Sequence, residues 1–251
     1  MTDIIIHVGL HKTGTTFLQE EVFSRIKKVN YTGILRYDTK IYKDKINIIS
    51  DEDLSIRPHL PVNHKDYLNC NQRFVIAKRL HSIFPTAKII IGIRNKDSWL
   101  RSVYSQYVKS GGIYNYDRFI CESFDHRFLD FDSYIDYLND LFNEVLVYRF
   151  EDLKQNPFNF VKNICDFIGL DTPRFENRIW EKRWSKRQIK LGLFLNHFFN
   201  SSFNPNSGFF FRTRSFNPRY LIDQLNVGEN WLRKSFRPKS YDLPNRITST
   251  K

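Results

Sequence analysis

Short apolar runs alternate with longer segments of mixed polarity through the first two thirds of the chain. The apolar runs predict buried strands at Ile4–Val8, Ile46–Ile49, Lys88–Ile93 and Val145–Tyr148. Segments with helical spacing predict helices at Thr15–Lys28, Gln72–Phe84, Ser98–Lys109, Tyr134–Phe142, Pro157–Ile168 and Lys186–Phe199. Strands that alternate with helices are typical of βαβ units, so we expect an α/β fold with a central parallel sheet flanked by helices.

The pattern loosens after about residue 170, where a helical and loop-rich C-terminal region is expected. Ser201–Pro218 is rich in Asn, Ser, Gly and Phe and predicts an ordered loop. Its aromatic run Phe209–Phe211 is expected to fill the side of the core, with membrane contact as the alternative. No internal repeat and no long linker divides the sequence, so a single domain over residues 1–251 is predicted.

Composition narrows the class of protein. Hydrophobic residues make up 41% and aromatic residues 16% of the 251 residues, which is enough apolar surface to exclude a disordered chain. The net charge of +12 fits a polyanionic small ligand, and it leaves a non-enzymatic binder of nucleic acid or anionic membrane as an alternative. Acidic residues are interleaved with the basic ones, which disfavours nucleic acid as a partner.

The N-terminal residues lead directly into the first predicted strand, without the basic segment and long apolar run of a signal peptide. No apolar run approaches the roughly 18 to 20 residues that cross a bilayer. We therefore expect a cytoplasmic protein and leave a peripheral membrane contact open.

A glycine-bearing turn follows the first predicted strand. It contains Gly9, Lys12, Thr13, Gly14, Thr15 and Thr16. Glycine lets the backbone approach a ligand closely, and the N-terminus of the next helix presents N–H groups and partial positive charge to an anion. The lysine and the hydroxyl groups add side-chain donors. The turn therefore predicts an anion-binding loop, which makes the expected sheet one of P-loop type; a plain strand–turn–helix with a threonine cap is the structural alternative.

The residue order in this loop differs from that of a Walker A motif. Walker A places lysine directly after its second glycine, whereas here Lys12 precedes Gly14. A nucleoside triphosphatase also needs a metal-holding aspartate after a later strand, whereas Lys88–Ile93 is followed by Arg94. We therefore predict a polyanionic ligand, no metal-ligating residues and no required metal. A nucleotide-dependent small-molecule kinase is the alternative that these two differences disfavour.

Three segments together resemble the PAPS-dependent sulfotransferase family. They are Lys12–Thr16, the pair Arg94 and Ser102, and Phe150–Leu153. PAPS, 3′-phosphoadenosine 5′-phosphosulfate, is the sulfuryl donor of that family. The resemblance implies that the loop holds the 5′-phosphosulfate and that Arg94 and Ser102 hold the 3′-phosphate. It also implies a donor-binding core at about residues 3–170 and a substrate or cap region at about 171–251.

Leu18 and Gln19 follow the threonines, in a form similar to bacterial and Golgi-type carbohydrate sulfotransferases. The resemblance therefore implies transfer of the sulfuryl group to a hydroxyl or amine, with a saccharide or glycolipid favoured over other small hydroxylated acceptors. In-line transfer needs stabilisation of charge on the bridging oxygen, for which Lys12 is placed, and a general base for the acceptor proton.

Glu52 is the favoured base. It belongs to the acidic cluster Asp51–Asp53, which follows a predicted strand at the sheet edge where α/β enzymes assemble active sites. It also resembles the glutamate of a Ser-x-Glu segment in related glycan sulfotransferases. His11, inside the loop, is the second choice, and a solvated acidic turn is the structural alternative. The remaining candidates are Asp51, Asp53, His7, His59 and His64.

Overall fold

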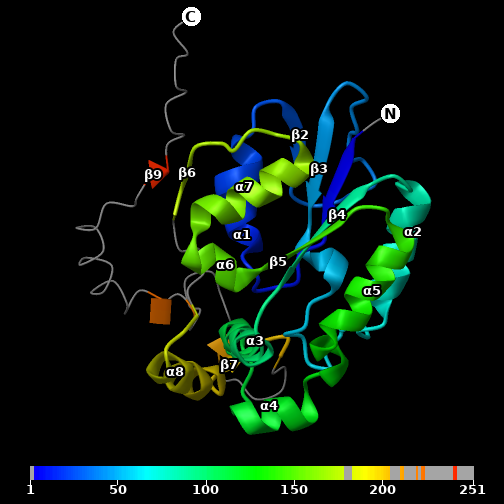
Figure 1. The fold of residues 1–251 in the computed structure, drawn as a ribbon. Coiled ribbons are helices and arrows are strands. Elements are labelled where there is room, and N and C mark those ends of the chain that lie inside the picture. The colour runs from blue at the N-terminus through cyan, green and yellow to red at the C-terminus, as the bar shows by residue number, and fades with distance from the viewer. Residues whose placement is uncertain are drawn as a thin grey trace, which may run out of the picture.

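The computed structural model of the chain describes residues 3–177, 183–203, 210–211, 219, 222–223 and 240–241. Its centre is a five-stranded parallel sheet with the order β2-β3-β1-β4-β5 (Figure 1). The strands are β1 (Ile4–His7), β2 (Val29–Thr32), β3 (Ile46–Ser50), β4 (Lys88–Ile93) and β5 (Val145–Arg149). The predicted α/β fold with a central parallel sheet is confirmed.

The register of the sheet places the candidate loop at a functional edge. His7, the last residue of β1, pairs with Ser50 at the end of β3 and with Ile90 of β4. After β1, the next two strands of the chain, β2 and β3, lie on one side of β1, and the following two, β4 and β5, lie on the other side. The strand order therefore reverses at β1. Ligands of open α/β sheets bind at the carboxyl edge where the order reverses. The loop after β1 lies there.

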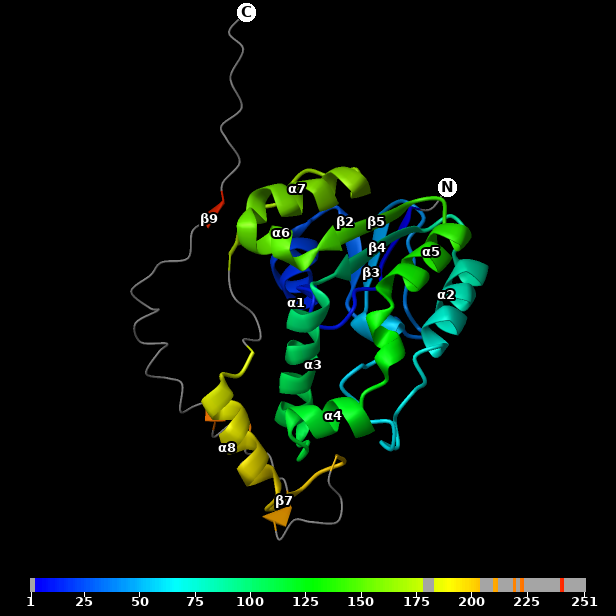
Figure 2. The same cartoon turned by 60° about the horizontal axis from the view of Figure 1, so that its bottom comes forward.

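Helices cover both faces of the sheet (Figure 2). Ile4 and Ile6 belong to one buried cluster with side chains of α2 (Gln72–Ile83) and α5 (Phe131–Leu141). Ile5, which points to the opposite face, packs with α1 (Thr15–Phe17) and α7 (Pro157–Ile168). Successive residues of a strand alternate between the two faces, and both faces of β1 are buried, which explains its unbroken apolar sequence.

The remaining helices lie at the carboxyl edge or beyond it. They are α3 (Lys96–Ser110), α4 (Tyr116–Glu122), α6 (Phe150–Gln155) and α8 (Lys186–Asn196). A 3₁₀ turn, η4 (His126–Leu129), precedes α5. Two short pairings follow α7: β6 (Phe175–Glu176) with β9 (Ser240–Tyr241), and β7 (Phe199–Asn200) with β8 (Phe210–Phe211). In the described part of the chain, every helix is too short or too polar to span a bilayer.

Several elements differ from the prediction. The edge strand β2 was not predicted, because Val29–Thr32 mixes polar and apolar residues and is only half-buried. The first helix is not continuous over Thr15–Lys28: α1 passes into a π-helical turn, η1 (Leu18–Val22), then a 3₁₀ turn, η2 (Phe23–Arg25). The short helices α4 and α6 were also missed.

The C-terminal predictions are met only in part. The predicted helix Lys186–Phe199 ends at Asn196, because Phe199 already pairs as the first residue of β7. Of the predicted loop Ser201–Pro218, residues 204–209 and 212–218 lie outside the described residues, and so does Phe209 of the aromatic run. The backbone of the other two phenylalanines forms β8.

Candidate active site

The loop after β1 has a backbone that depends on its glycines. Gly14 has φ 94° and Lys12 has φ 68°, both in the left-handed region. A Cβ atom added to Gly9 would lie 2.7 Å from Thr15 Oγ1 and 2.8 Å from His7 Nε2, so a larger residue does not fit there. A lysine in the left-handed region is strained, and such strain is found at binding sites.

Three successive carbonyl groups of the loop accept hydrogen bonds from side chains. Thr13 Oγ1 donates to the Leu10 carbonyl oxygen at 2.5 Å, and Trp99 Nε1 donates to that of His11 at 2.7 Å. Arg94 Nη1 donates to the Lys12 carbonyl oxygen at 3.1 Å. With these oxygens engaged, the groups left for a ligand are the N–H donors of the first helical turn, which have no partner within a helix. This arrangement suits an anion.

Arg94 and Ser102 belong to the segment that follows β4, next to the loop after β1. Arg94 follows β4, and its Nε donates to Ser98 Oγ at 2.9 Å. Its guanidinium carbon lies 4.4 Å from the centre of the Phe150 ring, a cation–π contact. Ser102 is buried on α3, about one turn after Ser98. The structure therefore joins Arg94 to the loop, and it places Ser102 on the helix that Arg94 precedes.

The segment Phe150–Leu153 packs against the loop from the other side. A Cβ atom on Gly14 would lie 3.1 Å from Leu153 and 3.3 Å from Phe150. The Asn95 backbone N–H donates to Glu151 Oε1 at 3.2 Å, which ties the segment to the residue after Arg94. The loop, Arg94 and Phe150–Leu153 are thus in contact with one another, and Ser102 lies on the helix that follows Arg94.

Replacement of Gly14 by alanine tests how tightly this packing fixes the loop. Gly169 is a matched control, because it has φ 83° at the end of α7 and a Cβ atom there would meet nothing within 4 Å. Gly169→Ala should cost only the left-handed strain, about 1 to 2 kcal/mol of the free energy of unfolding. Gly14→Ala should cost more, since Leu153 and Phe150 must also move. Urea unfolding measures both costs; equal values would contradict the packing described.

Glu52, the favoured base, lies beside His11. Glu52 begins a 3₁₀ turn, η3 (Glu52–Ser55), which follows β3 and is capped by the carboxylate of Asp51. His11 is buried, with Nδ1 3.3 Å from Glu52 Oε1 and Nε2 3.3 Å from Asp53 Oδ1. Arg57 in turn donates to Asp53. The two leading candidates for the base, far apart in sequence, therefore form one charged cluster.

The cluster changes the protonation of its members. Burial alone lowers the pKa of His11, but the carboxylates of Asp53 and Glu52 outweigh it, so the pKa of His11 is raised above 6.5. Hydrogen bonds from Arg57 and then from His11 hold the pKa of Asp53 below its usual range. The raised pKa of His11 favours its protonated form beside the two carboxylates, and a protonated imidazole accepts no proton.

These shifts predict how stability depends on pH. Because the pKa of His11 is raised by folding, its stabilisation is complete below about pH 6.5 and is lost as the pH rises through the raised value. Asp53 behaves oppositely and loses its stabilisation only in acid, below about pH 4. The difference in free energy of unfolding between wild type and His11→Gln should therefore shrink as the pH rises above about 6.5. A difference in urea unfolding that stays constant as the pH rises would contradict the ion pairs.

The other candidates for the base occupy different environments. His7 is fully buried and lies 2.7 Å from Ser50 Oγ and 3.1 Å from the Tyr148 hydroxyl; burial lowers its pKa to about 3. Burial, with the nearby charge of His11, also lowers the pKa of His59 to about 3. His64 is buried against Phe203, and Asp51 accepts from the backbone of Leu35 and Asp53. Among these, only Asp51, Asp53 and His59 line the cavity described next.

A cavity of about 390 Å³ opens beside Lys12 and Glu52. Its lining also includes Gln19, Gly33, Ile34, Arg57 and Gln106, together with His11, Asp51, Asp53 and His59. Sequence reasoning did not assign Gln19, Arg57 or Gln106 to the site, nor Trp99 to the support of the loop. Arg57 had a local signal in its spacing of four residues from Asp53, and Gln19 had one in the form of the loop, in which it follows Leu18. In the part of the chain that is described, no group of His, Cys, Asp and Glu side chains has the arrangement of a metal site.

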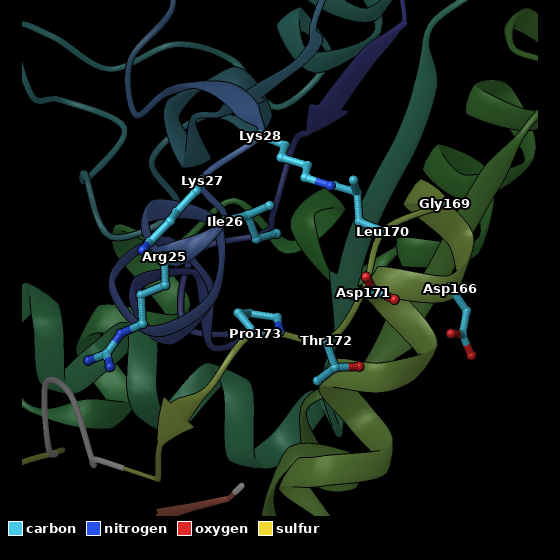
Figure 3. Close-up of a pocket in the computed structure, with 10 residues that line it drawn as sticks. All are labelled: Arg25, Ile26, Lys27, Lys28, Asp166, Gly169, Leu170, Asp171, Thr172 and Pro173. Atoms are coloured by element: carbon cyan, nitrogen blue, oxygen red, sulfur yellow. The ribbon is translucent and has the colours of Figure 1, made fainter. Parts of the chain in front are cut away.

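A larger hollow of about 600 Å³ lies at the opposite edge of the sheet, between Arg25–Lys28 and the loop after α7 (Figure 3). Lys28 directly precedes β2, so this hollow is at the amino edge of the strands, away from the loop. Its lining contains both basic and acidic side chains. Arg25 pairs with Glu21, and Asp166 pairs with Lys162. Size alone therefore does not identify the active site of this chain.

The sequence model of the sulfotransferase domain family matches residues 1–214, so the chain belongs to that family. The predicted resemblance and the predicted enzyme class, a sulfotransferase, are confirmed. No curated protein sequence matches significantly. Similar solved structures include a sulfotransferase from Alicyclobacillus acidocaldarius, at 14% identity and TM-score 0.49, covering 78% of this chain and 93% of that one. Mouse sulfotransferase SULT7A1 complexed with PAP has 20% identity and TM-score 0.45, covering 78% of this chain and 65% of that one.

Proposed function

We propose that this chain transfers the sulfuryl group of PAPS to a hydroxyl or amine of a saccharide or glycolipid. The observation that carries the proposal is the anion loop, in which side chains engage three successive carbonyl groups and Lys12 and Arg94 stand together. A cation thus follows β4 where nucleotide hydrolysis would need a metal-binding acid. The sulfotransferase domain family supplies the reaction class.

The residues fit a donor with two separated phosphates. Gly9 lets Thr15 Oγ1 and the His7 ring pack directly against the loop, and the start of α1 supplies N–H donors for the 5′-phosphosulfate. Arg94 has the planar fork of donors that matches a phosphate, and Ser102 adds a hydroxyl from the same β4–α3 unit. We therefore assign Arg94 and Ser102 to the 3′-phosphate, and Gly9, Lys12, Thr13, Gly14, Thr15 and Thr16 to the phosphosulfate.

The proposed chemistry is in-line displacement at sulfur. The acceptor oxygen or nitrogen forms a bond to sulfur while the bond from sulfur to the bridging oxygen of the 5′-phosphate breaks. Glu52 takes the acceptor proton, and adenosine 3′,5′-bisphosphate leaves with the electron pair on its phosphate. Lys12 and the loop N–H groups stabilise the charge that gathers on the bridging oxygen. His11, held between Glu52 and Asp53, orients the base.

The cavity beside Lys12 and Glu52 supports a polyhydroxylated acceptor. The amide nitrogens of Gln19 and Gln106 already donate to Ser50 and Ser110, which leaves their amide oxygens as acceptors for a substrate hydroxyl, and the ring of His59 offers an apolar face. Its volume of about 390 Å³ is within the range of small-molecule sites. Cytoplasmic residence stays a prediction.

Binding of the reaction product tests the donor before the acceptor is known. Adenosine 3′,5′-bisphosphate should bind in calorimetry without added metal, and ATP with Mg²⁺ should bind far more weakly. Arg94→Ala should weaken the binding of the bisphosphate by roughly 2 to 4 kcal/mol, because a charged hydrogen-bond donor to a phosphate is lost. Arg79→Ala, at an exposed position of α2, is the matched control and should leave the affinity unchanged.

Tight Mg²⁺-dependent binding of ATP, with no response to the bisphosphate, would reject the proposal in favour of a kinase. An equal loss of affinity in both arginine variants would instead reject a contact between Arg94 and the 3′-phosphate. It would show that the affinity depends only on the net positive charge of the protein.

A further inference from the structure

The outward face of α8 carries a continuous apolar stripe. Leu191, Phe194 and Phe198 are 36%, 62% and 37% exposed. Leu191 and Phe194 are about one turn apart on α8, and Phe198, two residues beyond its end, has its ring in contact with that of Phe194, with centroids 5.1 Å apart. The other exposed large apolar residues described are Val75 and Ile83, eight residues apart on α2, and residues of the segments 34–42 and 62–68. Scattered exposed apolar residues are normal, whereas a contiguous exposed patch indicates an interaction surface.

The inner face of α8 is already fixed to the protein. Asn196 Nδ2 donates to the carbonyl oxygens of Val108 and Gly112 at 2.8 Å each. Gly192 faces the Trp184 ring so closely that a Cβ atom would lie 2.5 Å from it. In both views α8 lies at the periphery, beyond α3 from the sheet (Figures 1 and 2). The packing of α8 onto α3 therefore uses other residues and does not account for the outer stripe.

Basic residues continue the stripe toward the N-terminus of α8. Lys186, Arg187 and Lys190 are all exposed, and no acidic residue occurs between 186 and 200. By helical geometry Arg187, Lys190, Leu191 and Phe194 fall within an arc of about 100°, and Phe198 follows two residues after the end of α8. Long basic side chains beside exposed aromatic ones are typical of a helix that lies in the interface of an anionic membrane.

We propose that the outer face of α8 binds the surface of an anionic lipid bilayer, with Phe194, Phe198 and Leu191 inserted below the headgroups and Lys186, Arg187 and Lys190 among the phosphates. The charge complementarity selects a lipid surface over an apolar protein partner. This inference does not depend on the reaction proposed above.

The cavity and the proposed membrane face are connected through Phe203. The chain runs from α8 through β7 to Phe203, whose ring stacks on His59 with centroids 6.5 Å apart. His59 lines the cavity. A bilayer on α8 would therefore lie near the segment that flanks the acceptor cavity, which gives a lipid-linked acceptor a short path to it.

Vesicle co-sedimentation of the full chain tests the proposal. The chain should bind vesicles of phosphatidylcholine mixed with phosphatidylglycerol and bind pure phosphatidylcholine much less. Phe194→Ser should weaken binding to the mixed vesicles roughly ten- to a hundredfold, because one inserted aromatic side chain is lost. Lys190→Glu should weaken it about tenfold, and added salt should abolish this difference. Ile83→Ser, 64% exposed on α2, is the matched control and should bind as wild type does.

Thermal melting and calorimetry with the bisphosphate check that the variants keep their fold and donor site. Mixed vesicles that do not bind, or bind all three variants like wild type, would overturn the proposal. So would equal losses in Phe194→Ser and Ile83→Ser. A dimer in light scattering that Phe194→Ser dissociates, without vesicle binding by wild type, would assign the stripe to a second copy of the chain instead.

Discussion

Lys12→Ala should reduce the turnover of sulfuryl transfer about a hundred- to a thousandfold, the usual cost of removing one stabilising donor from a developing oxyanion. Its effect on the affinity of adenosine 3′,5′-bisphosphate should be much smaller, because the charge of Lys12 matters most when the bridging oxygen becomes anionic. The backbone of residue 12 should survive the change, since alanine and lysine bear similar strain at φ 68° and the carbonyl still accepts from Arg94.

Single-turnover kinetics and calorimetry separate the two effects of Lys12→Ala. Lys78→Ala, on the exposed face of α2, is the control for a general loss of positive charge and should behave as wild type does. A Lys12 variant with native turnover but weak product binding would show that the lysine only binds the donor.

Glu52→Gln should reduce turnover about 10²- to 10⁴-fold while bisphosphate binding stays nearly intact. Glutamine keeps the shape of the side chain and removes the basic carboxylate. The acid limb of the kcat/KM profile should vanish with it, because that limb follows protonation of the base in the free enzyme. Glu122→Gln is a control at an exposed glutamate that pairs with Arg118 on α4.

The histidine beside Glu52 gives the alternative outcome. His11→Gln should reduce turnover less than Glu52→Gln, because the role proposed for His11, 3.3 Å from Glu52 Oε1, is to orient that carboxylate, and its raised pKa favours the protonated form. A native rate in Glu52→Gln together with a collapse in His11→Gln would transfer the role of base to the histidine. Donor binding of the histidine variant must be measured as well, since His11 lies in the donor loop and its carbonyl is held by Trp99.

The buried parts of the fold could be predicted because they have a strong local pattern. β1 and β4 are apolar on both faces, so their runs of isoleucine indicate central parallel strands without further information. β2 lies at the edge and is half-buried, so its polar and apolar residues give no such run. The first helix was predicted as continuous because its apolar spacing continues, whereas η1 and η2 arise from packing against distant elements such as Phe175.

The anion-binding loop could also be predicted, because a strand, glycines, a lysine and a helix start occur in one stretch of sequence. The side chains from distant segments that contact this loop could not be predicted. Trp99 donates to a carbonyl oxygen 88 positions earlier, and His11 meets Glu52 across the β1–β3 pairing. Such contacts depend on the register of the sheet, which no local spacing reports.

The hydrogen bond from Trp99 makes α3 a part of the donor loop. The same helix bears Ser102 near its middle and receives Asn196 of α8 at the carbonyl of Val108 near its end. Because α3 contacts both the loop and α8, we expect ligand binding at the loop to slow the local opening of α8, and the packing of α8 to slow that of the loop. A substitution that loosens the far end of α3 should then weaken the binding of adenosine 3′,5′-bisphosphate, although that end of the helix lies away from the loop.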